Sequence, residues 1–254
     1  MLKISLYLLP AYLMISIATS SQIINVENSR MHSDTTGWMG GAGAAFNLTK
    51  NVKQVTGIDL TSHLQYKTKD DKGLWLLLGN YNFLKAGIEK LASQGFGHIR
   101  YNRKLNAWLR WEIFGQFQNN IVTQIDSRFL VGTGLRIKIV KNKKLRLYSA
   151  SLLMFENEKE KTTPVLKHND LRNSSYITFT YLPLENIELV CTSFFQPLLK
   201  KFADYRILNQ SALKVKATSR FSLSLKWNYL FDTFPAGDAP KTTYTFATGI
   251  DYDF

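Results

Sequence analysis

The last twelve residues of the chain, TYTFATGIDYDF (243–254), constrain the fold more than any other stretch. The residues between Thr243 and Asp253 at odd positions are small or polar. At even positions they are apolar or aromatic, with Thr248 as the single polar exception: Tyr244, Phe246, Ile250, Tyr252 and Phe254. A period of two places the two sets on opposite faces of a β-strand. One continuous apolar face on such a long strand is typical of a barrel that crosses an outer membrane.

The same alternation recurs through the chain. The clearest segments span residues 54–67, 97–102, 107–118, 129–139, 145–155, 177–181, 187–195, 204–216 and 221–231. Segments 38–47 and 74–83 also indicate strands, but the first is rich in Gly and Ala and the second is apolar on both faces, so their phase stays open. We therefore predict an all-β fold, a transmembrane antiparallel up-and-down β-barrel of about 12 strands. The alternative, a soluble sandwich, would leave its aromatic stripes in water.

The lengths of the connections support an up-and-down order. Short turns are expected at 68–73, 103–106, 141–144, 182–186 and 217–220, and longer loops at 84–94, 159–173 and 232–241. Pro197 is expected to end the strand 187–195. With the N-terminus in the periplasm, the short turns lie on the periplasmic side and the longer loops on the outside, as in bacterial barrels.

The first residues have the pattern of an export signal. A single Lys3 precedes an apolar run from Ile4 to Ala18, which is followed by small residues. The run is too short to span about 30 Å of hydrocarbon as a helix. We predict a signal peptide at 1–21, a short periplasmic segment at 22–36, and a barrel at 37–254 in the bacterial outer membrane.

Composition limits the remaining chemistry. The single Cys191 excludes internal disulfides and cysteine metal sites. The net charge is +13, and for an exported protein such an excess indicates lipid headgroups or anionic solutes as neighbours rather than nucleic acid. We expect a monomer that contacts outer-membrane lipids. A terminal Phe254 resembles the signal by which bacterial barrels are recognised by the barrel-assembly machinery.

Several stretches together resemble one known family. They are HIRYN (98–102), WEIFGQFQNN (111–120), RFLVGTGLR (128–136), MFENEKE (154–160), FFQP (194–197), DYRI (204–207) and the terminal Phe. The chain is similar to the exported barrels catalogued as domain of unknown function 481, also called salt-induced outer-membrane proteins. The resemblance implies an outer-membrane barrel and supplies no catalytic residues. Phe194-Phe195 stands where an aromatic Tyr pair is usual in the family.

Alternation also predicts which polar side chains face the interior. The candidate network comprises His98, Arg100, Arg110, Glu112, Gln116, Arg128, Arg136, Glu156, Glu158, Arg172, Gln196, Asp204, Arg206 and Asp232. Mixed charge of this density either lines a water-filled pore or fills a narrow interior with paired ions. The central group is expected to be Glu156 and Glu158 with Arg128 and Arg172.

Three functions are compatible with these residues. The first is a structural or stress-related barrel with a charge-filled interior, and the second is a pore for small solutes. Inward cations outnumber inward acids, which would make such a pore prefer anions; the cations are Arg100, Arg110, Arg128, Arg136, Lys138, Arg146, Arg206, Lys214, Lys216 and Lys226. The third is a membrane-embedded hydrolase, but no His-x-Ser sequence is present and Asp70-Asp71 falls in a turn. We therefore predict no enzyme, cofactor or metal site.

Overall fold

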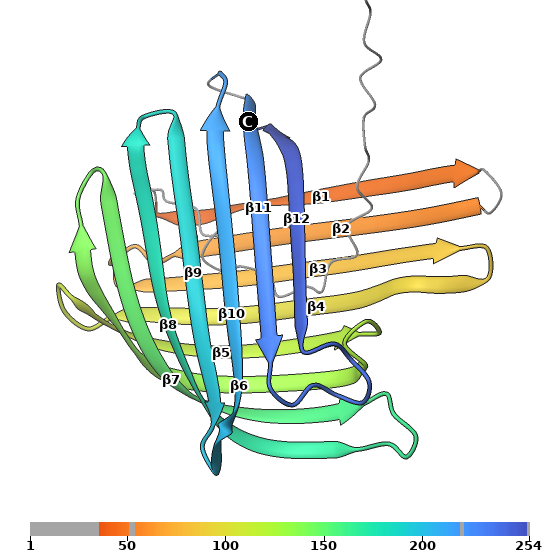
Figure 1. Ribbon diagram of the computed structural model, residues 1–254. Helices are drawn as coiled ribbons and strands as arrows, with labels where there is room; N and C mark the ends of the chain where they lie inside the picture. The colour runs from red at the N-terminus through yellow and green to blue at the C-terminus, as the bar shows by residue number, and fades with distance from the viewer. Residues whose placement is uncertain (1–35, 51–53, 219–220, 253–254) are drawn as a thin grey trace, which may run out of the picture.

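The computed structural model describes residues 36–50, 54–218 and 221–252, which form one curled antiparallel sheet (Figure 1). The predicted signal peptide, the segment 22–35 and Phe254 lie outside the described residues. The strands are β1 Gly37–Lys50, β2 Gln54–Lys67, β3 Gly73–Ala86, β4 Glu89–Lys104, β5 Leu109–Asn120, β6 Ile125–Lys141, β7 Leu145–Glu160, β8 Lys167–Leu184, β9 Ile187–Leu198, β10 Lys201–Lys216, β11 Phe221–Asp232 and β12 Thr242–Tyr252. No helix in these ranges is long and apolar enough to cross a membrane.

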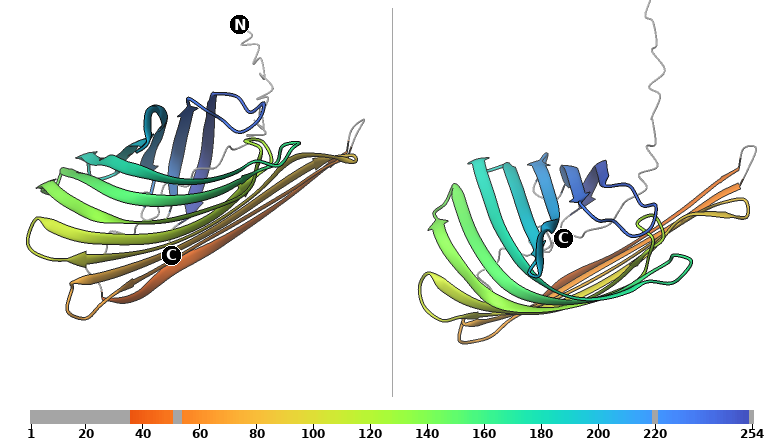
Figure 2. Two further views of the ribbon diagram at one scale, coloured as in Figure 1. Left: turned by 90° about the horizontal axis from the view of Figure 1, so that it is seen from below. Right: turned by 60° about the horizontal axis from the view of Figure 1, so that its bottom comes forward.

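Each strand pairs with the next one along the chain. The order runs from β1 to β12 without a crossover, which confirms the predicted all-β, up-and-down architecture. In Figure 2 the sheet bends into a deep trough, with β1–β4 on one side and β9–β12 on the other. Among the described residues no ladder joins β1 to β12, so the curled sheet has two free edges.

Alternation sorts the side chains between the two faces as predicted. Outward residues such as Val131 and Leu223 are more than half exposed, at 57% and 54%. The third strand, whose phase the sequence left open, turns Leu76 and Leu78 inward and Trp75 outward. A wide apolar outer face of this kind suits a hydrocarbon environment and is unfavourable in water.

The expected loop 159–173 is only 161–166, because β8 begins at Lys167. Two further predictions of where strands end are also wrong. The expected loop 84–94 is a two-residue connection at 87–88, where Gly87 adopts a positive φ of 60°. Pro197 does not end its strand, because β9 continues to Leu198 and the next connection is only 199–200. The polar residues at both places lie on strand ends, and irregular pairing at Leu84/Lys85 and at Lys201/Tyr205 accommodates the continuation.

The sheet therefore has two distinct ends. We call the end with connections 68–72, 105–108, 142–144, 185–186 and 217–220 the turn end. The opposite end, which we call the loop end, carries 87–88, 121–124, 161–166, 199–200 and 233–241. The connection 233–241, predicted as one of the longer loops, is the longest in the described chain and is at the loop end.

The interior is not only polar, which the sequence analysis did not anticipate. Two inward clusters are apolar: Phe114, Leu130, Ala150, Leu152, Met154 and Tyr176 form one, and Leu76, Leu78 and Phe96 form the other. These residues share strand parity with inward charged residues. The sequence did contain an indication of these clusters, since β5 and β7 have apolar residues on both faces. A strand that is apolar on both faces indicates a filled interior.

Candidate functional site

Two carboxylates on β7, Glu156 and Glu158, form the centre of the site. They lie two residues apart, so alternation places both on the inner face, in line with the buried Leu152 and Met154. Only 1% of Glu156 and 4% of Glu158 is exposed. Carboxylates buried to this extent must have charged or hydrogen-bonding partners.

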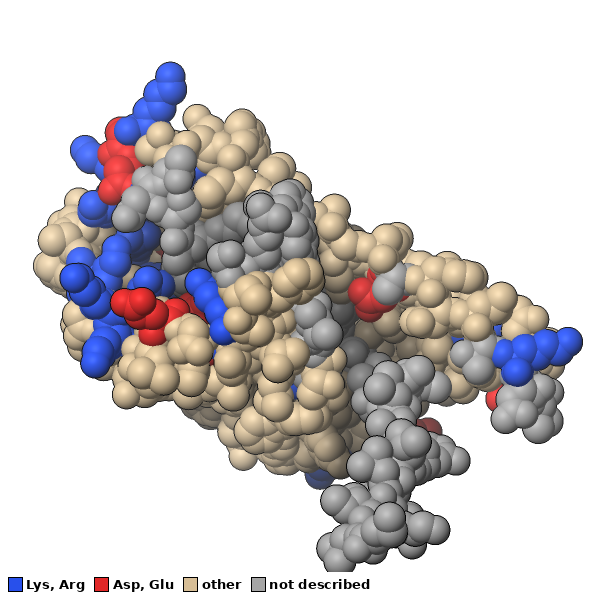
Figure 3. All heavy atoms as spheres, turned by 90° about the horizontal axis from the view of Figure 1, so that it is seen from above, with Lys and Arg blue, Asp and Glu red and all other residues tan. Residues whose placement is uncertain are grey.

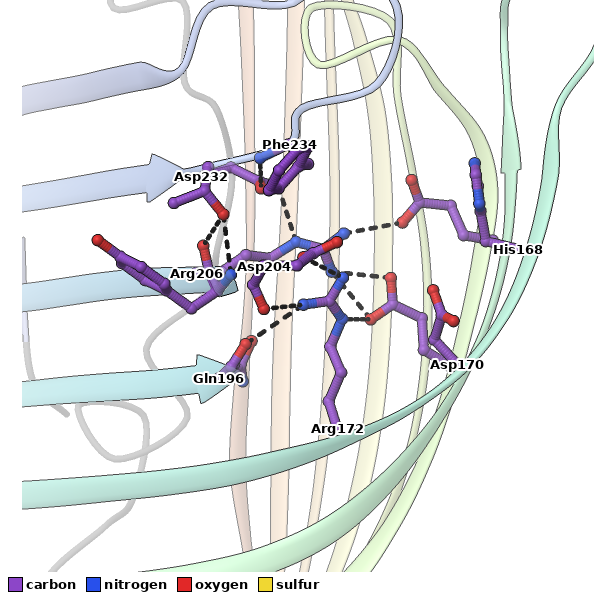
Figure 4. Close-up of polar contacts among 12 residues, drawn as sticks. His168, Asp170, Arg172, Gln196, Asp204, Arg206, Asp232 and Phe234 are labelled. Carbon is purple, nitrogen blue, oxygen red and sulfur yellow. Dashed lines mark hydrogen bonds and ion pairs between the residues drawn. The ribbon is translucent and has the colours of Figure 1, made fainter. Parts of the chain in front are cut away.

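Arg206 on β10 supplies the largest set of contacts to these carboxylates (Figure 4). Its Nη1 lies 2.8 Å from Oε1 and 2.9 Å from Oε2 of Glu156, and its Nη2 lies 3.3 Å from Oε2 of Glu158. Its Nε donates to Oδ2 of Asp232 on β11 over 2.7 Å. One guanidinium thus joins three carboxylates, using the fork of donors that only Arg provides.

Two further arginines complete the arrangement. Arg128 on β6 donates from Nε to Oε2 of Glu158 over 2.5 Å and lies 3.4 Å from Oε1 of Glu156. Arg172 on β8 lies 3.3 Å from Oε2 of Glu156 and 2.9 Å from Oδ1 of Asp204. Arg172 also donates to the backbone oxygen of Gln196 over 3.4 Å.

We call these seven charged residues the carboxylate–arginine cluster: Arg128, Glu156, Glu158, Arg172, Asp204, Arg206 and Asp232. They come from five strands, and three positive charges face four negative ones. Since each ion has lost most of its water, the attraction between partners mainly offsets desolvation. The cluster therefore fixes how the strands approach one another across the interior.

A second buried group surrounds Glu112 on β5, whose side chain is 0% exposed. Oε1 of Glu112 lies 3.3 Å from Nη1 of Arg100 and 3.8 Å from Nη1 of Arg136. The Tyr176 hydroxyl donates to Oε2 over 2.5 Å. The Arg136 guanidinium also lies over the ring of Tyr148, 4.3 Å from its centroid, which adds a cation–π contact.

Thirteen of the fourteen candidates lie in these two groups or contact them. His98 donates from Nδ1 to Oε1 of Gln116 over 2.9 Å, and its Nε2 accepts from Arg100 Nε over 3.3 Å. Arg110 is the exception. It lies nearer the turn end, directly opposite Lys104 on β4 and Arg136 on β6.

The loop 233–241 covers the interior at the loop end, and the sequence analysis had not assigned it this role. The backbone NH of Gly237 donates to Oε2 of Glu160 over 3.2 Å, and that of Asp238 donates to Oε1 of Gln124 over 3.3 Å. Ala236 and Ala239 are buried. A loop between β11 and β12 thus reaches β7 and the connection 121–124 across the trough, and we call it the cap loop.

Gly237 is the residue that allows this approach. Its φ is 48°, and a Cβ at this position would lie 2.1 Å from Oε1 of Gln124. Positive φ and close contact both favour glycine. The signal in the sequence was a pair of prolines flanking small residues, PAGDAP (235–240), which indicates a fixed loop rather than a freely solvated one.

A small cavity remains between the cluster, the Glu112 group and the cap loop. Its volume is about 100 Å³. The wall combines the aromatic rings of Phe114, Tyr176 and Phe194 with the polar ends of His98 and Gln118. This volume is large enough for several water molecules.

The residues offer little to an enzymatic mechanism. Among the described residues, no group of three or more His, Cys, Asp or Glu side chains is placed to hold a metal ion. Asp70 and Asp71 lie in the turn 68–72. Asp71 lies 2.6 Å from Nζ of Lys67 and 3.6 Å from Nζ of Lys104, and the hydrogen bond from Lys67 lowers its pKa. Both carboxylates have a structural role in the turn.

A family model described as "Protein of unknown function, DUF481" matches residues 28–254. The chain belongs to this family. The match confirms the resemblance carried by HIRYN, RFLVGTGLR and the related stretches. None of the curated proteins matches the DUF481 chain in sequence.

Solved structures similar to this DUF481 protein are outer-membrane barrels. The NanC porin has a TM-score of 0.52 and 9% identity, with 78% of this chain and 94% of that chain covered. The KdgM porin has a TM-score of 0.45, 10% identity and coverage of 85% and 99%. The translocator domain of the autotransporter NalP from Neisseria meningitidis has a TM-score of 0.47, 11% identity and coverage of 90% and 92%. At this identity, the likeness to the NanC porin concerns the fold, that of an outer-membrane β-barrel.

Proposed function

We propose that this DUF481 protein resides in the bacterial outer membrane as a structural or stress-related barrel, its interior filled by its own side chains. The observation that carries the proposal is the carboxylate–arginine cluster, which joins β6, β7, β8, β10 and β11 through ion pairs. The apolar outer face supports the location, because lipid-facing residues of such barrels are apolar while inward ones are polar.

A filled interior follows from three features at the loop end. The cluster occupies the space between facing strands, the apolar cluster around Phe114 and Leu152 lies beside it, and the cap loop closes over both. Conduction requires a continuous aqueous path with sites that bind solutes weakly. Paired, buried ions instead hold one another in place. The proposal includes no catalytic step.

Conductance of the folded protein in planar bilayers is the direct test. We expect no steps, or steps far smaller than those of an open porin measured in the same bilayer. Heat-modifiable gel mobility of the same sample would show that the barrel is folded, so that an absence of conductance cannot be due to misfolding. Regular, voltage-independent steps from the unaltered protein would contradict the proposal.

A pore that prefers anions is the second candidate. It is favoured by inward cations near the turn end, such as Arg110 and Arg146, which form no ion pair with any acidic side chain in the described part of the chain. The fold shared with the NanC porin is compatible with this role. The same bilayer recordings distinguish the two, because a pore of this kind would conduct and its reversal potential in a salt gradient would indicate anion preference.

The proposed location also implies partners. The outer face is expected to contact lipids, and the C-terminal strand that ends at Phe254 is expected to engage the barrel-assembly machinery. We infer a monomer. Assembly into liposomes by purified assembly machinery should slow when Phe254 is replaced by Ala, and light scattering in detergent should give the mass of one chain. Unchanged assembly or a dimeric mass would contradict these inferences.

A further inference from the structure

We propose that the inner face at the turn end is a binding site for a soluble multivalent anion bearing phosphate or carboxylate groups. This goes beyond the proposed role of the cluster, and it does not depend on whether the interior conducts. The site consists of four inward cations on three adjacent strands, here called the inner basic face: Arg110, Lys138, Lys141 and Arg146.

The strand register shows that these side chains face inward. Arg110 lies two residues from the buried Glu112 and therefore shares its face. Lys138 lies opposite Tyr148, whose ring is covered by the inward Arg136. The pairing then shifts between Lys138 and Val140, which brings Lys141 opposite Arg146 on the same face.

Two further inward cations, Lys216 on β10 and Lys226 on β11, lie across the trough and are not part of the inner basic face. Lys216 lies opposite the buried Ser222, and Lys226 lies opposite Ala212. Lys226 shares strand parity with Ser224, which is also buried. In Figure 3 most of the Lys and Arg side chains in view gather toward one end of the molecule, with Asp and Glu among them.

None of these four side chains is paired with an acidic side chain in the described part of the chain, in contrast to the arginines of the loop end. Within the described ranges, none of the four forms an ion pair. Arg110 even lies between two cations, Lys104 and Arg136, on the neighbouring strands. The inward carboxylate nearby, Glu112, is already engaged by Arg100 and Arg136.

This contrast indicates a ligand. Like charges directly opposite one another on adjacent strands destabilise a sheet, and the same chain pairs its arginines with carboxylates only a few residues away along the strands. A bound anion would supply the missing negative charge. Because the side chains face the interior rather than the lipid-facing surface, the ligand is a soluble anion and not a membrane headgroup. Cations on several strands favour a ligand with several negative groups.

Calorimetric titration of the folded protein in detergent with tripolyphosphate tests the proposal, and citrate serves as the carboxylate probe. The test variant combines Arg110→Gln, Lys138→Gln and Arg146→Gln. The matched control combines Lys72→Gln, Lys143→Gln and Lys144→Gln, which removes three charges from exposed turns at the same end. We expect the unaltered protein and the control to bind alike and the test variant to bind about ten-fold more weakly or not at all, with affinity falling as salt rises.

Thermal unfolding gives a second measurement that does not depend on detecting heat. Without anion, the test variant should be at least as stable as the unaltered protein, because repulsion between like charges is removed. Tripolyphosphate should raise the unfolding temperature of the unaltered protein and the control only. Absence of binding to the unaltered protein, equal losses in both variants, or undiminished binding by the test variant would each overturn the proposal. A preference between tripolyphosphate and citrate identifies the group that is recognised.

Discussion

At the scale of single residues, Arg206 is central to the interior because it forms ion pairs with three carboxylates. It contacts Glu156, Glu158 and Asp232, which come from strands on both sides of it in the curled sheet. Removal of the Arg206 side chain would leave these three carboxylates buried away from water and without the guanidinium that they share. Breaking a buried pair in this way costs far more than forming it gains.

We therefore expect Arg206→Met to destabilise the folded barrel by about 3–5 kcal/mol, the cost of leaving buried charge uncompensated. Urea unfolding in lipid or detergent, followed by tryptophan fluorescence, measures the change. Arg103→Met is the matched control, because Arg103 is exposed and its guanidinium contacts the hydroxyl of Tyr101; it should cost less than about 0.5 kcal/mol. Equal effects of the two substitutions would mean that the cluster does not hold the strands.

Strand parity predicted the membership of the two buried groups, but it could not predict the partners. Glu158 and Arg128 are cross-strand neighbours, so register alone brings them together. Arg206 meets Glu156 although β10 and β7 are not adjacent in the sheet, and this contact depends on the curl of the whole sheet. The inward positions of Phe114 and Met154 were overlooked for a related reason. Apolar residues on the inner face can be recognised as a packed cluster only when the strands that they face across the interior are known.

At the scale of elements, the cap loop depends on one glycine. Gly237 has φ of 48°, and any side chain would meet Gln124 and Thr162. Gly237→Val should detach the loop from β7 and the connection 121–124 and so raise bilayer conductance above that of the unaltered protein. Gly97→Ala is the control, because nothing lies within 4 Å of its added Cβ, and it should leave conductance unchanged. If both variants stayed silent, the cluster rather than the loop would be what closes the interior.

The outward face of the strands gives a prediction that depends on depth. Val131 lies in the middle of β6 and is exposed, whereas Leu184 is exposed at the very end of β8. Arg in place of Val131 should destabilise the inserted barrel by about 2–4 kcal/mol, and Arg in place of Leu184 by about 0–1 kcal/mol, because the hydrocarbon ends near the strand ends. Folding titrations into lipid vesicles measure both. The reverse order would place the membrane at a different level of the sheet.

Element boundaries were less predictable than element faces. The charged residues Lys85, Glu89 and Lys90 suggested a loop at 84–94, yet both strands continue through this stretch as far as the connection 87–88. Pro197 likewise lies inside β9, where it pairs with Tyr205 next to an irregularity. At strand ends that leave the apolar zone, side-chain polarity no longer distinguishes strand from loop, because both are solvated there.

At the scale of the whole molecule, the order and number of strands follow from the sequence, while the curl does not. The described sheet keeps free edges at β1 and β12. Unpaired backbone groups are costly in lipid, where no water can satisfy them. β1 contains the stretch GGAGAA (40–45), so few side chains fix its position against a partner strand. Closure thus depends mainly on backbone pairing.

We expect β1 and β12 to pair when the protein is inserted in a membrane. The two strands run antiparallel in an up-and-down barrel, and directly opposite residues have Cβ atoms about 4.5–5.5 Å apart, which is within reach of a disulfide. In a Cys191→Ser background, Ala44→Cys is combined in turn with Tyr244→Cys, Phe246→Cys and Thr248→Cys. One of the three pairs should crosslink within a single chain far more efficiently than the others, as seen by gel mobility after oxidation. Ala44→Cys with Phe155→Cys on β7 is the control and should not crosslink. Crosslinked bands at twice the mass of the chain would show instead that the two edges pair between copies.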